Sequence, residues 1–414
     1  MRQDDYSCGT LFAMRMQNAM VRLLFSTLIL LMASRLPAQD LREPRFVERA
    51  QAAFADIFNM DYDKARQAFV LLAKDYPTHP APPLYLASII WLEEMLRRQD
   101  LSLNRFIAPA YFTGKTSLAM SSGERSAFFS YLQKSQDLSK AILQKKRDDA
   151  DARYFLATAY GLRSSFAITI DHSMREAFSY GNRAYASMKK LTEEKPDYHD
   201  AYLAVGIYEY IVGNIPWYLK WMAYVIGARG NKDNGMEHLR LASEKGQYVR
   251  NEAQLVLMVL YVREHRLAEA LEIARSLSGK YPRSFLFPIN VAQILRMSGQ
   301  KDQASATLLQ LEKKAEAKEP NFDKLPLQSF RFDMAVELMF MGKLDAAEER
   351  FRKVIDDPQA SREKKALSHL RLGQILDWEH RPREAYREYQ TVLSFEDFDG
   401  SHAKARELLK KQNP

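Results

Sequence analysis

The stretch LAEALEIARSLSGKYP, residues 267–282, repeats a pattern that first occurs in YDKARQAFVLLAKDYP, residues 62–77. In both stretches the pattern consists of five positions, and the steps between them are three, four, three and five residues. In the later stretch these positions are Leu267, Ala270, Ala274, Leu277 and Pro282. Spacings of three and four residues place side chains on one face of an α-helix, and Pro ends a helix because it lacks an N–H donor. The two stretches therefore predict the same helix at two places in the chain.

Looser copies of the pattern predict further helices of the same kind. They are Ala184, Met188, Leu191 and Pro196; Gly299, Ala304, Leu308 and Leu311, with Gly342 in the role of Gly299; Leu344, Ala347, Phe351, Val354 and Pro358; and Pro382, Ala385, Tyr389 and Val392. The first copy follows another apolar helical face at 46–58, after a short break at 59–61. Each copy is therefore interpreted as the second helix of an antiparallel hairpin, with its small Ala where the two helices approach closely.

This set of spacings resembles the tetratricopeptide repeat, whose period is about 34 residues. Successive alanines of the pattern, Ala270, Ala304, Ala347 and Ala385, are 34, 43 and 38 residues apart, so the repeats are degenerate. The resemblance covers most of 44–397 and implies an all-α, right-handed superhelical solenoid of about seven antiparallel helical hairpins. Such an array presents an extended concave surface, which typically binds a peptide or helix of a partner protein. A generic helical bundle is the alternative fold.

Composition agrees with a folded helical chain and indicates no nucleic-acid partner. Hydrophobic residues make up 47% and charged residues 27% of the 414 residues, and only 16 are Gly. The net charge is +8 and the pI is 9.2, but basic runs such as Lys145–Arg147 are short and lie beside acids. A nucleic-acid footprint needs a continuous basic stripe with interleaved aromatics, and the linear sequence contains none, although a folded groove could still assemble one.

The start of the chain predicts export. Residues 23–33, LLFSTLILLMA, form an apolar run of 11 between Arg22 and Arg35. A membrane-spanning helix needs about 20 apolar residues, so this run fits a secretory signal peptide better. Cleavage is expected after Ala38 or Gln39, which gives a periplasmic or secreted protein. The alternative is a membrane tether through an uncleaved N-terminal segment. No later run approaches 18 apolar residues, so no stable membrane insertion is expected after cleavage.

The first residues fit poorly as part of that signal. They are acidic where a signal is normally basic, and Met14, Met16 and Met20 all offer later starts. We expect one of these to be the true start, with 1–39 comprising an over-long start and the signal peptide. The single cysteine, Cys8, would then be absent, and no disulfide framework is possible in any case.

Residues 201–250 interrupt the repeats with a concentration of Tyr and Trp. Aromatic side chains with polar tips often dominate binding interfaces, so this stretch supplies the candidate binding residues. They are Tyr208, Tyr210, Asn214, Trp217, Tyr218 and Trp221. Two alternatives stay open, a joint between hairpins that serves packing only and a pocket at 206–224 that carries a small apolar or lipidic ligand.

The same stretch resembles, over about 50 residues, a block of the tetratricopeptide repeat protein 39 and yeast inclusion-body-clearance family. The residues that carry the resemblance are Gly206, Tyr210, Pro216, Leu219, Gly227, Gly230, Gly235 and Leu239. That family often has a second Pro where Trp217 stands here. The resemblance implies a shared architecture and not a shared role, since those proteins are intracellular. The glycines at 227, 230 and 235 are interpreted as turn residues with unusual backbone angles.

No residue pattern indicates catalysis, a metal or a cofactor. Gly114-Lys115-Thr116 resembles the end of a phosphate-binding loop, but Pro109 stands where that loop needs a Gly. No two of the eight histidines lie three or four residues apart, so none share a helix face as metal ligands. The sequence therefore predicts no catalytic residues, no metal site, no cofactor and no enzyme.

The predicted layout follows the chain in five parts. These are the leader at 1–39, N-terminal helical repeats at 40–200 with an insertion at 99–126, the irregular aromatic hairpin at 201–250, C-terminal repeats at 251–397, and a tail at 398–414. The predicted function is an exported scaffold that binds a protein or peptide partner through its concave surface, and carriage of an apolar ligand in the 206–224 joint is the alternative.

Overall fold

The computed structural model describes residues 41–98, 100–101, 103, 119–214 and 230–412, and this part of the chain is helical with no strand. Its first nine α-helices are α2 (Pro44–Phe58), α3 (Tyr62–Asp75), α4 (Ala81–Arg97), α6 (Ser122–Lys145), α7 (Ala150–Thr169), α8 (Met174–Glu194), α9 (Tyr202–Gly213), α11 (Lys232–Lys245) and α12 (Arg250–Arg263). The others are α13 (Leu267–Lys280), α14 (Leu286–Met297), α15 (Lys301–Glu316), α16 (Leu327–Phe340), α17 (Leu344–Asp356), α18 (Arg362–Trp378), α19 (Pro382–Val392) and α20 (Ser401–Gln412).

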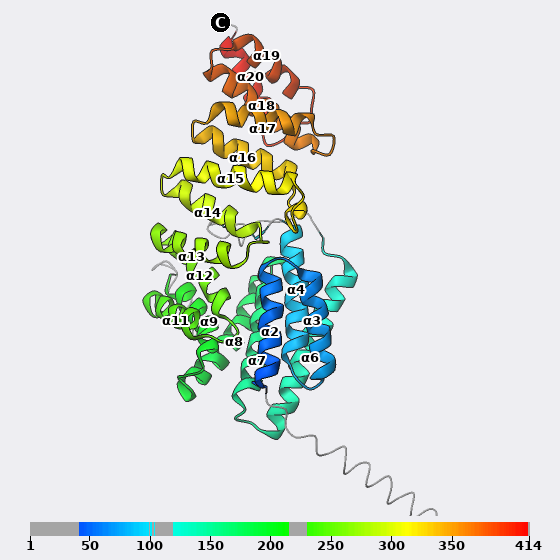
Figure 1. Cartoon of the computed structure of the whole chain (residues 1–414), viewed down its shortest axis with the longest axis vertical. Coiled ribbons are helices and arrows are strands. Elements are labelled where there is room, and N and C mark those ends of the chain that lie inside the picture. Colours follow the sequence, from blue (N-terminus) through cyan, green and yellow to red (C-terminus); the bar gives the residue numbers. More distant parts are fainter. Residues whose placement is uncertain (1–40, 99, 102, 104–118, 215–229, 413–414) are drawn as a thin grey trace, which may run out of the picture.

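These helices form antiparallel hairpins that stack on their neighbours, as the repeat pattern predicts. Within the described residues the hairpins are α2–α3, α4–α6, α7–α8, α9–α11, α12–α13, α14–α15, α16–α17 and α18–α19, one more than the expected seven. Helices α11 to α19 climb in chain order toward the C-terminus, and α2, α3, α4 and α6 lie beside the lower part of this stack (Figure 1). The chain is therefore an all-α solenoid of the tetratricopeptide type.

The repeated alanine occupies the close contact within each hairpin. Ala65, Ala270, Ala347 and Ala385 are 0% exposed and Ala304 is 1% exposed. A larger side chain at these positions would force the two helices apart, because protein interiors are close-packed. The predicted register of the repeats is therefore confirmed.

The turn inside five of these hairpins has one shared backbone geometry. Five residues before each alanine, a residue adopts the left-handed conformation: Met60 (φ 66°), His265 (58°), Gly299 (76°), Gly342 (78°) and His380 (59°). The next residue then donates its N–H to a carbonyl five positions back, as Arg381 does to Leu376 at 2.8 Å. This arrangement ends a helix by satisfying its last carbonyls. Gly342 does repeat the role of Gly299, and two His and one Met fill the same position without the freedom of Gly.

Helices α9 and α11 pack backbone against backbone. A Cβ atom added to Gly235 would lie 2.5 Å from the Tyr210 backbone N, and one added to Gly206 would lie 2.8 Å from the Gly235 backbone O. Neither Gly230 nor Gly235 has a positive φ. The interpretation of these two glycines as turn residues with unusual angles is therefore wrong, since they permit close approach of helices. Gly227 lies outside the described residues.

Helix α2 makes contacts far along the chain, against loops that join one hairpin to the next. Its Phe54 ring meets the Tyr248 ring with centroids 6.4 Å apart, and its Phe58 ring stacks on Tyr281 at 5.0 Å. Figure 1 shows α2 running along the direction in which the hairpins stack. The first helix therefore covers the loop edge of the middle hairpins.

The turn after α2 is held by two of these loops. Arg283 forms an ion pair with Asp61 and donates its backbone N–H to Asn59 Oδ1 at 3.1 Å. Asn321 donates to Asn59 O at 2.8 Å and to Asp61 Oδ1 at 2.6 Å. We call these contacts the 59–61 clamp. Repeat spacing does not predict the clamp, because its partners belong to different hairpins.

The structure differs from the predicted layout at the insertion and at the C-terminal tail. Helix α6 begins at Ser122, so the connection after α4 is shorter than 99–126. The tail contains α20, whose Ser401 and Ala405 are 1% and 0% exposed, so it packs against the last hairpin. None of the described helices has the length and apolar character needed to cross a membrane.

Candidate partner-binding surface

The predicted aromatic segment is only half described, and its described half is engaged in internal contacts. Tyr208 stacks on Tyr185 with ring centroids 3.8 Å apart and donates its hydroxyl to Asn182 Oδ1 at 2.8 Å. Tyr210 is 2% exposed and donates its hydroxyl to Glu264 Oε1 at 2.7 Å. Asn214 is exposed where α9 ends. Of the six candidate residues, Trp217, Tyr218 and Trp221 lie outside the described residues.

These contacts give Tyr208 and Tyr210 a packing role. Burial, together with the Glu264 carboxylate, raises the pKa of Tyr210 well above its ordinary value. Burial pushes the pKa of Glu264 upward, but hydrogen bonds from Lys232 and Tyr210 outweigh it and leave the pKa below its ordinary value. The hydroxyl of Tyr210 therefore joins α9 to the end of α12, which leaves Asn214 as the exposed candidate among the described residues.

The first described residues are built into the interior of the solenoid. Arg42 lies over the Tyr198 ring at 4.2 Å, and its Nε donates to Asp151 Oδ1 at 2.6 Å. The carbonyl of Leu41 lies 3.0 Å from His79 Nε2. The chain is therefore anchored two or three positions after the predicted cleavage sites.

A partly buried carboxylate, Glu252, lies on α12. Burial, with a contribution from the charge of Asp200, raises its pKa to about 7. Its Oε2 is buried and has no hydrogen-bond partner among the described residues. Asp200, in contrast, accepts backbone N–H groups of Gln247 and Tyr248, both at 2.7 Å. A shifted pKa alone does not make a catalytic site, and the described residues hold no cluster of three or more His, Cys, Asp or Glu side chains that could bind a metal ion.

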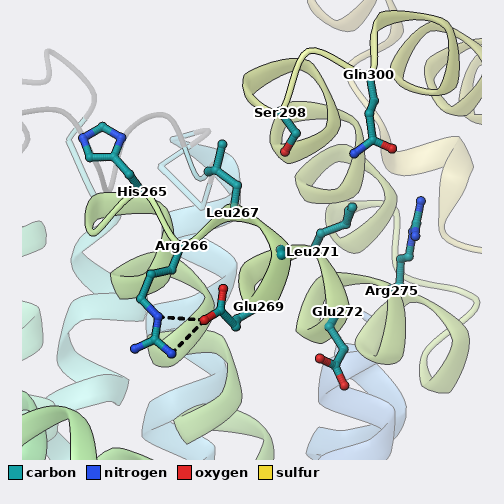
Figure 2. Close-up of a pocket in the computed structure, with 10 residues that line it drawn as sticks. His265, Arg266, Leu267, Glu269, Leu271, Glu272, Arg275, Ser298 and Gln300 are labelled. Atoms are coloured by element: carbon teal, nitrogen blue, oxygen red, sulfur yellow. Dashed lines mark hydrogen bonds and ion pairs between the residues drawn. The ribbon is translucent and has the colours of Figure 1, made fainter.

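An open groove of about 700 Å³ lies beside the turns of two neighbouring hairpins, and Figure 2 shows the residues that line it. Its lining residues are His265, Arg266, Leu267, Ala268, Glu269, Leu271, Glu272, Arg275, Ser298 and Gln300. Arg266 and Glu269 pair across its edge at 2.8 Å, as the dashed lines in Figure 2 mark. Enclosed pockets for small molecules bury most of the ligand, and this groove is open and charged. We therefore do not assign it a ligand.

Apolar side chains are exposed in register along the C-terminal hairpins. The position seven residues before the hairpin alanine is Met297 in α14, Phe340 in α16 and Trp378 in α18. Phe340 is 65% exposed, Trp378 is 55% exposed, and Met297 is half-buried. Equivalent positions in stacked repeats lie one above the other, so these side chains form a line that we call the exposed column.

Polar side chains lie beside the exposed column on the same helices. Arg296 Nε of α14 pairs with Glu337 Oε2 of α16 at 2.6 Å. Arg371 precedes Trp378 by seven residues, which places both on one face of α18. Its guanidinium donates to Gln374 Oε1 at 3.0 Å and meets no carboxylate in the described part of the chain. An apolar line with a flanking cation suits a protein surface better than a small ligand.

Sequence reasoning placed the candidate site on 206–224 and did not single out the exposed column. The signal was available, because counting back seven residues from each alanine gives a bulky apolar residue in three successive repeats. The same count gives Phe58 in the first hairpin, which the structure shows stacked on Tyr281.

Three solved structures are similar to this chain at low sequence identity. The human IFIT1 dimer with m7Gppp-AAAA is 12% identical, covers 89% of this chain and 81% of its own, and has a TM-score of 0.38. Yeast Tom70 is 13% identical over 89% of this chain and 88% of its own, with a TM-score of 0.33. A tetratricopeptide repeat protein from Parabacteroides merdae is 13% identical over 89% of this chain and 99% of its own, with a TM-score of 0.28.

Comparison with curated proteins gives no match. The family model described as Iml2/Tetratricopeptide repeat protein 39 matches residues 128–367, which is more than half of the chain. This range includes the α9–α11 pair, whose close contact depends on Gly206 and Gly235. On this match, the chain belongs to the Iml2/Tetratricopeptide repeat protein 39 family.

Proposed function

We propose that this protein is an exported, non-catalytic scaffold whose C-terminal hairpins bind a partner protein. The observation that carries the proposal is the exposed column, where Phe340 and Trp378 present large apolar side chains in register. Scattered exposed apolar residues are normal on protein surfaces, but an aligned set is typical of interaction sites. Aromatic residues contribute strongly to binding because they offer rigid area at little cost in conformational entropy.

The opposite edge of the solenoid, formed by the loops between hairpins, is partly occupied by the chain itself. Helix α2 covers the loop edge of the middle hairpins, and the 59–61 clamp fixes its end. The loop edge that α2 covers is therefore closed to other chains. The hairpins α14–α15, α16–α17 and α18–α19 continue past that end (Figure 1).

A capture experiment tests binding at this surface. We expect the full-length protein to retain a specific partner from envelope extracts, and Phe340→Ser combined with Trp378→Ser to lose it. Leu71→Ser is the matched control, because Leu71 is 52% exposed on α3, outside the exposed column. Retention of the partner by the double variant, or its loss from the Leu71 variant, would place the binding surface elsewhere.

We propose a protein partner in preference to a nucleic acid. Many described cations are already paired, as Arg331 and Arg350 are with Glu312. Adding an excess of RNA oligonucleotide to the capture experiment tests this choice, and displacement of the partner by RNA would contradict it.

The proposed location is the periplasm or the extracellular space. The short apolar run at 23–33 and the anchoring of Leu41 and Arg42 just beyond the expected cleavage site both support it. Mass spectrometry of the native protein should find an N-terminus near Gln39 or Asp40. An intact apolar segment on protein from the cytosolic fraction would refute export.

A further inference from the structure

The repeat position that carries the exposed column also carries an arginine. Counting back seven residues from Ala270 gives Arg263 of α12, in the hairpin that precedes Met297. Arg263 is the last residue of α12, and Met297, Phe340 and Trp378 are likewise the last residues of α14, α16 and α18. Arg263 is exposed, as Phe340 and Trp378 are. The line of side chains therefore continues from α14 to α12 with a cation in place of an apolar group.

Arg263 has no ionic partner within the described residues. The carboxylate of its neighbour Glu264 already accepts the Tyr210 hydroxyl at 2.7 Å and pairs with Lys232. Arg371 of α18 likewise meets no carboxylate in the described part of the chain. The four hairpins from α12 to α19 therefore carry an arginine without an acidic partner at each end of this line.

The carboxylates on this face already have cations of their own. Glu337 of α16 pairs with Arg296 of α14 at 2.6 Å. Asp333, about one helical turn earlier on α16, lies 3.5 Å from Lys364 of α18. These two pairs add no net charge, so the two arginines leave the face positive. Complementary charge on a partner speeds encounter and fixes its register, which favours an acidic partner here.

The separation of the two arginines indicates a chain segment and not a small ligand. Arg263 and Arg371 are three hairpin steps apart, and even directly packed helices lie about 8 Å or more from one another. A partner that reaches both must therefore span about 24 Å or more. That span takes about seven residues of extended chain or about 16 residues of helix.

A nucleic acid also carries negative charge, but it fits this face less well. Its phosphates recur at every nucleotide and need a continuous stripe of cations. Between the two arginines lie Met297, Asp333 and Glu337, an apolar side chain and two carboxylates. A protein segment that combines carboxylates with apolar side chains matches this arrangement better.

We propose that the exposed column binds an acidic segment of a partner protein, whose carboxylates pair with Arg263 and Arg371 and whose apolar side chains contact Met297, Phe340 and Trp378. The proposal rests on the proposed function and specifies the chemistry of its partner. Salt screens the attraction between exposed charges but not the apolar contacts, so salt weakens this binding without abolishing it.

Selection from a random peptide library tests the proposal on the full-length protein. Peptides of about 20 residues reach both arginines whether they bind extended or as a helix. We expect the selected peptides to carry apolar residues flanked by Asp or Glu. Arg263→Glu should shift the selection toward Lys or Arg at one flank. Arg175→Glu on α8 is the matched control, because Arg175 is also exposed but lies outside the column.

Binding of one selected peptide then measures the contribution of each side chain. Phe340→Ser and Trp378→Ser should each weaken it at least about tenfold. Arg263→Gln and Arg371→Gln should each weaken it about two- to fivefold and reduce its dependence on salt. Arg263→Lys keeps the charge and should restore most of the binding, and Arg175→Gln should not change it. Far-UV spectra that match the parent protein show that the variants are folded.

Several results would overturn the inference. They are selected peptides without acidic residues, binding that is unchanged in both Arg263→Gln and Arg371→Gln, and a library that yields no peptide dependent on Phe340. The proposed function survives these results if capture from envelope extracts still depends on Phe340 and Trp378. Displacement of a bound peptide by single-stranded RNA would instead overturn both.

Discussion

The carboxyl group of Glu252 makes stability depend on pH in an unusual direction. Its folded-state pKa of about 7 lies above the ordinary value of 4.5, so between these values the folded protein holds a proton that the unfolded chain has released. This contribution to stability is complete below the unfolded pKa and is lost as pH rises through the folded pKa.

We therefore expect Glu252→Gln to be more stable than the parent protein at pH 8, by on the order of 2 kcal/mol, and nearly equal to it at pH 4.5. Urea unfolding of both proteins across this pH range measures the difference in the free energy of unfolding. The other carboxylates are the same in both proteins, so their effects cancel in this difference. Glu272→Gln on the exposed face of α13 is the control for loss of a surface carboxylate. A difference for Glu252→Gln that does not change with pH would show that Glu252 is not the group responsible.

The left-handed residues of the hairpin turns allow a second test on single residues. His380 has a φ of 59°, and an L-residue in this conformation is strained by roughly 1–2 kcal/mol. His380→Gly should stabilise the protein by about 0.5–1 kcal/mol, and Gly342→Ala should destabilise it by about 1–2 kcal/mol. A Cβ at Gly342 meets nothing within 4 Å, so denaturant midpoints report the backbone effect alone. Changes of the same sign in both variants would contradict the shared geometry.

At the scale of the helices, the α9–α11 pair depends on glycine, because Gly206 and Gly235 let the two backbones approach closely. Gly235→Ala would place a methyl group against the Tyr210 backbone, which cannot move aside as a side chain can. We expect a loss of about 2–3 kcal/mol in the free energy of unfolding. Gly279→Ala in α13 is the control, because a Cβ there meets open space and Ala favours helix by about 1 kcal/mol. Equal midpoints for the two variants would refute backbone contact between α9 and α11.

The sequence predicts the hairpins well because their determinants are local. The small residue at Ala270 and the bulky residues around it recur at helical spacing, and the structure buries them as expected. The left-handed turn was not predicted, although Gly299 and Gly342 stand at two of its five positions. His265 and His380 adopt the same positive φ because the surrounding turn imposes it. A His at these positions does not indicate a left-handed conformation in the sequence.

At the scale of the molecule, the docking of α2 was not predicted. Asn59 and Asp61 are ordinary turn residues in the sequence, and their partners Arg283 and Asn321 lie in loops of other hairpins. No period links these positions, so only the folded chain brings them together. The exposed column was not predicted for a related reason, because it is spread over three hairpins, whereas the Tyr and Trp residues at 206–224 are close together in the sequence.

The 59–61 clamp should control how firmly the first hairpin is held. Asp61→Ala should speed amide exchange in 44–58 and leave α18 unchanged, because the lost contacts hold only the end of α2. A double-mutant cycle with Arg283→Ala should give a coupling of about 1 kcal/mol, modest because Arg283 is partly exposed. Hydrogen exchange followed by mass spectrometry measures the first effect, and urea unfolding of the single and double variants measures the coupling. Additive effects of the two variants would show that the pair does not couple.

The long reach of that clamp has a consequence for how the protein is made. The partners of the 59–61 turn lie 222 to 264 positions later in the chain, whereas most solenoids complete each repeat against its immediate neighbour. The ribosome delivers α2 and α3 first, yet they cannot be seated until Lys324 has been synthesised. Contacts between such distant residues slow folding, because a large loop must close before they form. The first hairpin to emerge is therefore secured only after the five hairpins that follow it, and during that interval the apolar face of α2 is available to chaperones.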